Sequence, residues 1–449
     1  MNLSEIKKNP WAARLIHLLD IKEIKRRATN ISEPLQAQGK WNHTDIALLR
    51  KKLEELFLCS HQFAEILHTL IVASISHYLE CFPSESEVVK KLYNEGLFAE
   101  GSSSRLTPVY CLTGLAGTGK SALMDAFTRI LPQPESIDIG QHKGFQMKGI
   151  EKIKFGPQSR LTSVLQSLTH PNDKAHRNIK LIQAVMSNSI RHGIALILVD
   201  ETQFQTSSST AITLTSSTLE GIAQLRIPFI FASNYSLAHK LMTTNHEMRD
   251  RLLSQPILIS PDAADSEEWI EYVDQCKKIC GEWLQISKGD YFSLYCYTYG
   301  IKRYVIALLC LAFERMLSMK KDTVTIEDIL ASYQLEKYSS PRSVVEDLFQ
   351  IDSQGGIARR RHHKSFQCPF AVDAALREKK IKVAEDRMLK KVASKILETS
   401  AKQDERAATK SELPSPKSLP EKETRRPRKK TTQQDLMENS RAYADQQGH

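Results

Sequence analysis

Hydrophobic residues recur with a helical spacing through the first hundred positions of the chain. One stripe follows Ile46, Leu49, Leu53 and Phe57, and a second stripe occupies residues 63–75. Spacings of three and four residues place side chains on one face of an α-helix, and that face is buried against a neighbouring element. We therefore expect residues 1–104 to form a helical N-terminal region, in which no catalytic pattern is visible.

The pattern changes to short apolar runs between residues 108 and 260. Runs rich in β-branched and aromatic residues occupy positions 108–114, 150–155, 194–200, 227–233 and 256–260. Strands that are buried on both faces appear as continuous apolar runs, and their alternation with helical stretches is typical of a parallel sheet. Residues 105–262 are thus predicted to form an α/β core whose parallel sheet is sandwiched by helices.

Helical patterns return after this core. They cover residues 266–284, 300–317 and 325–334, and the last begins with Thr325-Ile-Glu-Asp, a capping-box pattern. We expect residues 263–340 to form a helical lid. The remaining residues, 341–449, are predicted to be basic and largely disordered, because the stretch is rich in Pro, Lys and Glu. One short helix is expected at 340–349 and one charged helix at 371–397.

The net charge of +10 is concentrated at the C-terminal end, where residues 371–449 contain 19 Lys and Arg against 13 Asp and Glu. A polyanion or an acidic protein surface is the natural counterpart of such a segment, and a solvated tail that aids solubility is the alternative.

The cysteines and apolar stretches limit the other classes of protein. Of eight cysteines, Cys276 and Cys280 are one helical turn apart, but no further His or Cys cluster completes a metal site. The N-terminus lacks a signal-peptide pattern, and the longest apolar stretch, residues 66–78, is too short to cross a bilayer. We expect reduced thiols and a cytoplasmic protein that does not use a membrane.

A glycine-rich motif follows the first apolar run. GLAGTGKS fits the pattern GxxxxGK[ST], with the residues Gly114, Leu115, Ala116, Gly117, Thr118, Gly119, Lys120 and Ser121. In such a loop, backbone N–H groups and a helix N-terminus face the β- and γ-phosphates, the lysine reaches the terminal phosphates, and the serine is a ligand of Mg²⁺. The motif predicts binding of ATP with Mg²⁺.

Two acids indicate what happens to the nucleotide. The apolar run at 195–201 ends in Asp200 and Glu201. Asp200 is expected to bind nucleotide and Mg²⁺ through water, and Glu201 to polarise the attacking water; two acids that merely end a buried strand are the alternative. The pair indicates an ATPase, and the missing NKxD sequence disfavours a GTPase.

Four further residues are candidates for three roles that complete the site. Asn234 follows the run at 227–233 and can orient the attacking water. Arg249 and Arg251 precede the last strand, where an arginine can enter the nucleotide site of an adjacent subunit. Arg251 is the favoured candidate for this role, and Arg249 is the second candidate. Arg303 begins a lid helix and can contact the phosphates. A turn residue or a solvated arginine is the alternative in each case.

This ordered set of residues resembles the AAA+ ATPases, with their Walker A, Walker B, sensor 1, arginine-finger and sensor 2 positions. Within that class the chain looks most like the TnsC/TniB transposition regulators, which are relatives of MuB and IstB. The similarity lies in LILVDETQF at 196–204 and LEGIAQLRIPFIFASN at 219–234, and it covers roughly residues 105–335.

The resemblance implies an ATP-dependent switch. ATP would promote a homo-oligomeric ring or helical filament on duplex DNA, which would recruit a transposase and respond to a target-selection protein, and hydrolysis would release it. DNA contact would be non-specific, with Lys154, Arg160, Lys174 and Arg177 as candidates. The alternatives are an AAA+ ATPase of replication initiation, helicase loading or defence signalling, and an interaction adaptor that holds ATP structurally.

Overall fold

The computed structural model describes residues 2–35, 41–84, 86–87, 89, 107–132, 136–139, 141–156, 160–169, 178–200, 202, 209–357, 361–371, 374–375 and 377–392. The chain divides into two units, Met1–Met388 and Leu389–His449. Only residues 389–392 of the second unit are described, and they are helical. The disorder expected in the C-terminal tail therefore falls largely outside the described residues.

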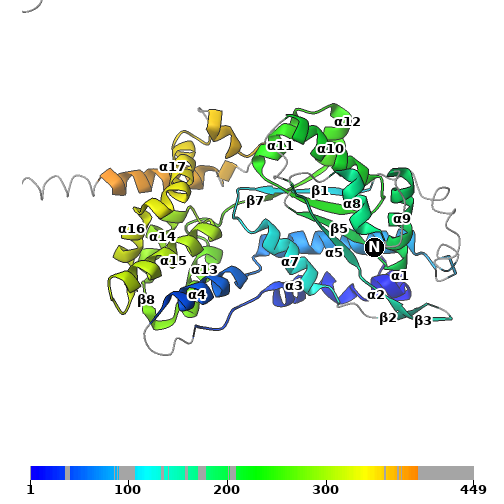
Figure 1. Cartoon of the computed structure of the whole chain (residues 1–449), viewed down its shortest axis with the longest axis horizontal. Helices are drawn as coiled ribbons and strands as arrows, with labels where there is room; N and C mark the ends of the chain where they lie inside the picture. Colours follow the sequence, from blue (N-terminus) through cyan, green and yellow to red (C-terminus); the bar gives the residue numbers. More distant parts are fainter. Residues whose placement is uncertain are drawn as a thin grey trace, which may run out of the picture. The chain divides into compact units, whose positions relative to one another are not determined.

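The α/β core of the first unit is built on a five-stranded sheet in the order β4-β5-β6-β1-β7, of which β7, β1 and β5 are labelled in Figure 1. Its strands are β1 Val109–Gly114, β4 Ile150–Lys154, β5 Leu196–Asp200, β6 Phe229–Ser233 and β7 Gln255–Ile259. Neighbouring strands pair in parallel. The apolar runs and the parallel sheet predicted from the sequence are thus confirmed, and β1, β5 and β6 are buried along their whole length.

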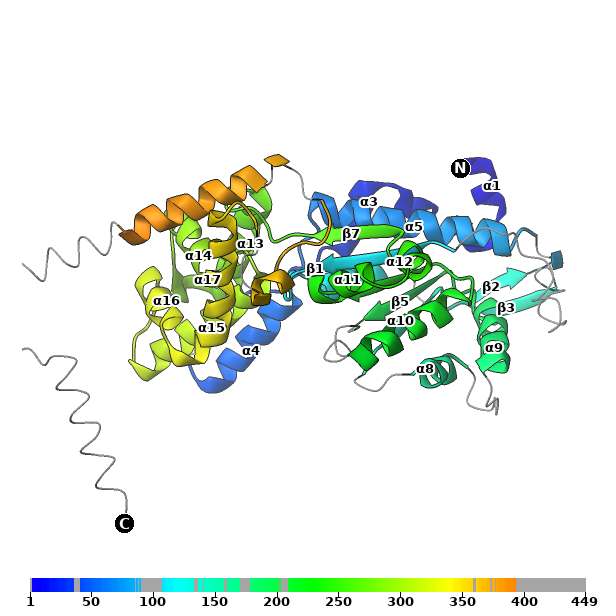
Figure 2. The same cartoon turned by 90° about the horizontal axis from the view of Figure 1, so that it is seen from above.

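Alternate side chains of the strands enter two different apolar layers. Tyr110 and Leu112 of β1 pack in one layer, whereas Val109 and Cys111 pack in the other. The helices of the first layer are α1 Leu3–Lys8, α2 Pro10–Ala13, α3 Ile21–Ala28, α5 His61–Cys81 and α7 Lys120–Ile130. Those of the second are α8 Leu161–Leu168, α9 Asn178–Arg191, α10 Ser209–Ala223, α11 Tyr235–Met242 and α12 His246–Leu252. Figure 2 shows α3 and α5 on one side of the sheet and α8 and α10 on the other.

The N-terminal region is helical, but its helices are divided between the core and the lid. Helices α1, α2, α3 and α5 cover the sheet, while α4 (His43–Glu55) packs on the lid helices α13 and α15. Leu49 and Leu53 of α4 are fully buried among lid side chains. The backbone N–H of Leu35 also donates a hydrogen bond to the carbonyl of Ile279 in α13, at 2.9 Å. This region therefore connects the two larger parts of the first unit.

The lid is built on one apolar cluster. Its elements are α13 Glu267–Cys280, β8 Leu284–Gln285, α14 Tyr291–Thr298, α15 Lys302–Ser318, β9 Val324–Thr325, α16 Ile326–Tyr333 and α17 Ser339–Ser353. The capping box expected at Thr325 is present, with Asp328 as its partner. Helix α17 begins before the expected end of the lid at residue 340. Its side chains Val345 and Leu348 belong to the same cluster, so the lid continues through α17.

Several elements were not predicted from the sequence, and two places in the fold show why. One is the antiparallel pair β2 (Ser136–Ile139) and β3 (His142–Gln146). The other is α14 in the lid. Both have weak periodicity in the sequence, since the strands are short and mostly polar and α14 is rich in tyrosine.

The chain after α17 is held against both larger parts of the first unit. The ring of His363, in the 3₁₀ turn Arg361–Ser365, is buried and lies 3.2 Å from the Asp347 carboxylate of α17. A ring nitrogen of His239 in α11 makes a hydrogen bond of 2.9 Å with the carbonyl of Gln367. This segment thus connects the lid to the α/β core.

The helical residues 377–388 pack on α17 through a buried arginine. Arg387 is 5% exposed, donates two hydrogen bonds to the Glu346 carboxylate at 2.7 and 3.1 Å, and lies 4.1 Å from the centroid of the Phe349 ring. Such a bidentate pair over an aromatic face fixes both the position and the rotation of the helix.

We expect Arg387→Met to release this helix from α17, because the substitution removes both hydrogen bonds and leaves Glu346 without its ion pair. The loss should be about 1–3 kcal/mol of local stability. Hydrogen exchange of residues 377–388 measures it directly. Lys379→Met is the control, because Lys379 is 64% exposed and reaches Asp265 only at 3.9 Å. Equal protection of this helix in both variants would contradict the packing described.

Candidate nucleotide-binding site

The glycine-rich motif forms a loop between the end of β1 and the start of α7. Gly117 and Gly119 have positive φ angles of 84° and 99°, a conformation that residues with a Cβ rarely adopt. Gly119 is the N-cap of α7, and no side chain caps that helix end. The first turn of α7 therefore presents its backbone N–H groups and the positive end of its dipole at the loop.

The lysine of the motif is folded into the loop. Lys120 is 8% exposed, and its Nζ donates to the carbonyl oxygens of Gly114 and Leu115 at 2.9 and 2.7 Å. The hydroxyl of Thr118 donates to the same Leu115 carbonyl at 2.9 Å. The ammonium group is thus held where an anion bound in the loop would be its stronger acceptor.

Ser121 and Asp200 come together from different elements. The Ser121 hydroxyl, in the first turn of α7, donates to Oδ1 of Asp200 at 3.2 Å. Asp200 ends β5 and is 4% exposed. A hydroxyl and a carboxylate are oxygen ligands of the kind that Mg²⁺ prefers. Ser121 and Asp200 are therefore close enough to share one ion or its bound water.

Glu201 lies outside the described residues, so its catalytic role stays a prediction. The next residue is described. Thr202 is fully buried, and its hydroxyl donates to the carbonyl of Ala232 in β6. This bond ties the chain after Asp200 to the neighbouring strand, and nothing in the sequence pattern singled Thr202 out.

Asn234 follows β6, which lies between β5 and β1 in the sheet. Its backbone is extended and caps α11, but its side chain makes no capping hydrogen bond to that helix. Because parallel strands end at the same edge of a sheet, Asn234 is on the edge that also holds the loop and Asp200.

Arg303 of the lid lies directly on the loop. A Cβ added to Gly117 would be 2.9 Å from the Cβ of Arg303 and 3.0 Å from Cγ2 of Ile301. The guanidinium-bearing side chain is exposed. The structure therefore brings together the loop, Ser121, Asp200, Asn234 and Arg303 on one edge of the sheet.

The two finger candidates are at the other end of the strands. After α12, the hydroxyl of Ser254 donates to the carbonyl of Val109 at the start of β1, at 3.2 Å. The six residues of β1 separate that end from the loop by about 17 Å at 3.3 Å per residue. The chain that directly follows Arg249 and Arg251 therefore lies at the end of the sheet opposite the loop.

Arg249 and Arg251 differ in what surrounds them. The Arg249 guanidinium is paired with Asp250 at 3.0 Å. Arg251 is exposed, and within the described parts of the chain it has no ion-pair partner. Of the two, Arg251 is the one available to an adjacent molecule.

The N-terminal region contributes to the site, which the sequence pattern did not reveal. A Cβ at Gly119 would be 3.6 Å from the ring of Phe63 in α5. Phe63 stacks on Phe57, with 5.5 Å between the ring centroids. The side-chain amide of Gln62 donates to the carbonyl of Leu258 in β7 at 2.8 Å. The aromatic positions that mark a helical stripe in the sequence thus also support the loop.

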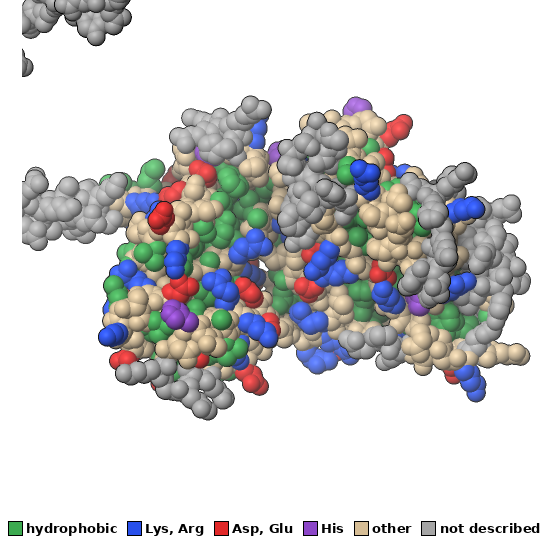
Figure 3. All heavy atoms as spheres, viewed as in Figure 1, with side chains coloured by type: hydrophobic (Ala, Val, Ile, Leu, Met, Phe, Trp, Pro, Cys, Tyr) green, Lys and Arg blue, Asp and Glu red, His purple; other side chains and the backbone are tan. Residues whose placement is uncertain are grey.

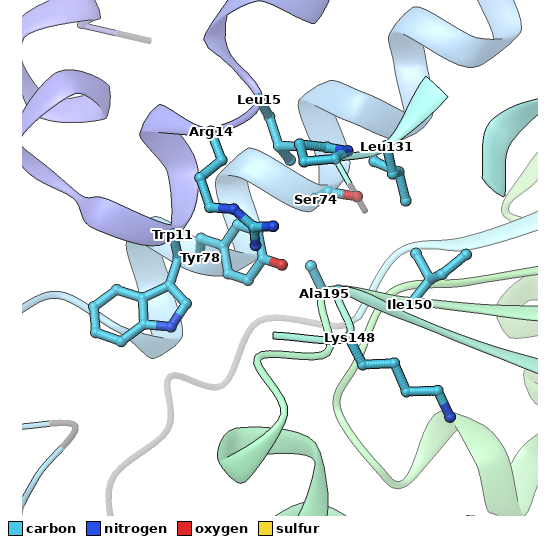
Figure 4. Close-up of a pocket in the computed structure, with 11 residues that line it drawn as sticks. Trp11, Arg14, Leu15, Ser74, Tyr78, Leu131, Lys148, Ile150 and Ala195 are labelled. Carbon is cyan, nitrogen blue, oxygen red and sulfur yellow. The ribbon is translucent and has the colours of Figure 1, made fainter. Parts of the chain in front are cut away.

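The pocket in Figure 4 is a different feature. It is lined by residues of α2, α5 and the starts of β4 and β5, among them Trp11, Arg14, Tyr78 and Lys148. Its volume of about 20 Å³ suits a single water molecule. It lies at the amino ends of the strands, opposite the loop, and contains no residue of the candidate site.

The cysteines are buried or partly buried and free. Burial raises the pKa of the Cys276 thiol to about 12, as is usual for a thiol that serves only packing. Among the described residues, no group of three His, Cys, Asp or Glu side chains is arranged to hold a metal ion. No single described helix passes a length and hydropathy test for crossing a membrane; one bent pair, Lys288–Thr298 with Lys302–Ser318, passes it.

Comparison with known proteins agrees with this geometry. Residues 105–252 match the family model described as an AAA domain, and no curated protein matches the chain. Similar solved structures include the ORC1 protein of Aeropyrum pernix in complex with DNA, with 15% identity, a TM-score of 0.35, and coverage of 60% of this chain and 66% of that one.

Two further structures are similar at the same level. The ORC2 protein of Aeropyrum pernix has 12% identity, a TM-score of 0.39 and coverage of 69% and 94%. The RuvB motor of Thermotoga maritima has 15% identity, a TM-score of 0.33 and coverage of 61% and 78%. The chain spans just under two thirds of the first of these three proteins. TM-scores this low do not support an assignment. The AAA-type P-loop core is therefore assigned from the match to the family model and from the order of the sheet.

Gly117→Ala should abolish or strongly weaken nucleotide binding, because the new methyl group meets Arg303 and Ile301 and the positive φ strains the loop. Titration with a fluorescent ATP analogue measures the effect. Gly144→Ala is the matched control, since Gly144 has a similar φ of 73° with nothing within 4 Å of an added Cβ. Each substitution adds about 1–2 kcal/mol of backbone strain. If the two variants bound the ATP analogue with equal affinity, the contact of Gly117 with Arg303 and Ile301 would be unimportant for binding.

Proposed function

We propose that this chain is an ATP-dependent DNA-binding regulator of transposition, which hydrolyses ATP between neighbouring copies of itself. The observation that carries the proposal is the meeting of the loop, Ser121, Asp200 and the lid residue Arg303 at one edge of the sheet. That arrangement supplies donors for a triphosphate and oxygen ligands for its metal ion.

The residues present fit ATP with Mg²⁺. The N–H groups from Gly117 to Ser121 and the Lys120 ammonium would hold the phosphates, and the Ser121 hydroxyl and Asp200 would hold the ion. Bound Mg²⁺ supplies charge neutralisation on the β- and γ-phosphates. In this proposal Glu201 accepts a proton from the attacking water, Asn234 orients that water, and Arg303 contacts the γ-phosphate.

Arg251 would act on a neighbouring copy. It precedes β7, whose first residue pairs with the start of β1 at the end of the sheet opposite the loop, and its side chain is exposed. An arginine supplied from outside neutralises charge that develops on the transferring phosphoryl group. A site completed in this way makes hydrolysis depend on assembly, so we propose a homo-oligomeric ring or filament.

We propose that the copies assemble on duplex DNA. The proposed partners are a transposase and a target-selection protein, which would bind to the assembled copies. The support is the sequence resemblance at 196–204 and 219–234. Of the basic candidates, Lys154 and Arg160 are exposed, while Lys174 and Arg177 lie outside the described residues. Figure 3 shows Lys and Arg side chains interspersed with acidic ones on one face. Contact with DNA would therefore be spread over several separate basic side chains.

Two other functions are alternatives to this proposal, and the experiments below distinguish them from it. An AAA+ ATPase of replication initiation, helicase loading or defence signalling would share the site and the assembly but act with other partners. The genes beside this one separate these readings, since a neighbouring transposase gene supports transposition. An adaptor that holds ATP structurally would bind the nucleotide without turnover.

Arg251→Ala and Glu201→Gln should each lower kcat by at least about a hundredfold, because each removes a group that acts only in the transition state. Mixing the two inactive variants should restore ATPase activity. In a mixed assembly the Glu201→Gln copy donates Arg251 to the intact Glu201 of its neighbour, which yields about a quarter of the sites active. Arg249→Ala should lower activity less. A mixture as inactive as its components would refute the shared site.

ATP or an unhydrolysable analogue should assemble the protein on duplex DNA of any sequence, as measured by sedimentation. Assembly should weaken at least about tenfold between 50 and 200 mM salt, because contacts to DNA phosphates release bound cations. Lys120→Ala, which loses the phosphate-binding ammonium, should remain unassembled. A monomer in the presence of both ATP and DNA would rule out the filament.

A further inference from the structure

Residues 260–266 form the linker that joins β7 to α13 of the lid. Four consecutive residues, Gly300 to Arg303, lie between the loop and this linker. Gly300 has a φ of +66°, and a Cβ there would be 2.8 Å from the carbonyl oxygen of Asp262 in the linker. Ile301 and Arg303 lie on Gly117 of the loop. The segment is therefore packed between the linker and the loop.

Lys302 faces the linker instead of the loop. Its Nζ is 3.6 Å from Oδ2 of Asp262, and the side chains are only 20% and 16% exposed. The same Nζ lies 5.2 Å from the centroid of the Phe63 ring and 5.3 Å from that of Tyr272. The ammonium group is thus enclosed by one carboxylate and two aromatic rings.

These neighbours come from three separate parts of the chain. Phe63 belongs to α5 of the N-terminal region and also contacts Gly119 of the loop. Asp262 belongs to the linker, and Tyr272 belongs to α13 of the lid. Lys302 is therefore the point at which the N-terminal region, the linker and the lid meet, one residue before Arg303.

A lysine at this position is unfavourable on its own. Lys302 is the first residue of the 17-residue helix α15, and the first turn of that helix contains no acidic residue. A cation at a helix N-terminus is repelled by the helix dipole. Burial also raises the pKa of the Asp262 carboxyl, and Lys302 opposes that rise. Each charge is therefore tolerated because of the other.

We propose that Lys302 is a positioning residue whose pairing with Asp262 holds Arg303 on the loop and thereby strengthens nucleotide binding. This inference rests on the proposed binding of ATP at the loop. The Lys302–Asp262 pair acts as a latch of the lid, because it fixes the start of α15 relative to the linker. Without the pair, α15 can move away from Gly117 and Arg303 loses its place over the loop.

The experiment is the affinity for an unhydrolysable ATP analogue with Mg²⁺, measured by titration. Lys302→Met keeps the apolar stem between the aromatic rings and removes the charge, and Asp262→Asn keeps the shape of the carboxylate. Each should weaken binding about tenfold, a typical size for coupling between sites. The double variant should be no weaker than either single variant, because one interaction is lost in all three. Lys302→Arg should retain most of the affinity.

A second measurement separates positioning from packing. In an Arg303→Gln background, Lys302→Met should have no further effect on affinity, since the arginine that it positions is gone. Lys321→Met is the control, because it breaks another lid ion pair, with Asp328 at 2.6 Å, that makes no contact with the loop. It should leave the affinity unchanged, and melting without nucleotide reports any loss of stability in each variant.

Three outcomes would overturn the latch. The first is an unchanged affinity for the analogue in both Lys302→Met and Asp262→Asn. The second is that Lys302→Met weakens the affinity as much in the Arg303→Gln background as in the unsubstituted protein. The third is that the variants lower the melting temperature but bind the analogue normally. If Lys302→Met fails to fold, the Asp262→Asn arm decides. An unsubstituted protein that does not bind the analogue would overturn the proposed ATPase as well, whereas normal binding with insensitive variants overturns the latch alone.

Discussion

The contact between Gly117 and the start of α15 is the constraint on which the site depends. A loop that presents backbone N–H groups to phosphates needs glycines with positive φ, and here one of those glycines, Gly117, also leaves room for Ile301 and Arg303. The P-loop and the lid therefore cannot be built independently. A nucleotide bound at this loop would contact both the P-loop and the lid. Its binding or release would therefore change the contacts of the lid.

The same dependence extends to the N-terminal region. Helix α5 supports the loop through Phe63, while α4 packs on the lid. The segment between them contains Phe57, which stacks on Phe63 and whose backbone groups exchange hydrogen bonds of 2.8 and 2.9 Å with those of Asn30. A region without any catalytic pattern thus touches both parts that would close around a nucleotide.

The sequence predicted those features whose signal is local. The strands are apolar runs, the P-loop is a contiguous motif, and the parallel order follows from strands that alternate with helices. The meeting of Ser121 with Asp200 was also predictable, because both follow strands that end at one edge of the sheet. The contact of Phe63 with Gly119 and the pairing of Lys302 with Asp262 were not. They join residues far apart in the chain, and no spacing rule connects a helical stripe with the loop that it supports.

The shared nucleotide site can be seen in a structure of the protein with Mg²⁺, an unhydrolysable ATP analogue and duplex DNA, determined by electron cryomicroscopy. We expect a triphosphate between Gly117 and Arg303, the ion at Ser121 and Asp200, and the guanidinium of Arg251 from a neighbouring copy within hydrogen-bond distance of the γ-phosphate. A triphosphate enclosed by a single copy, with every Arg251 turned to solvent, would refute the shared site.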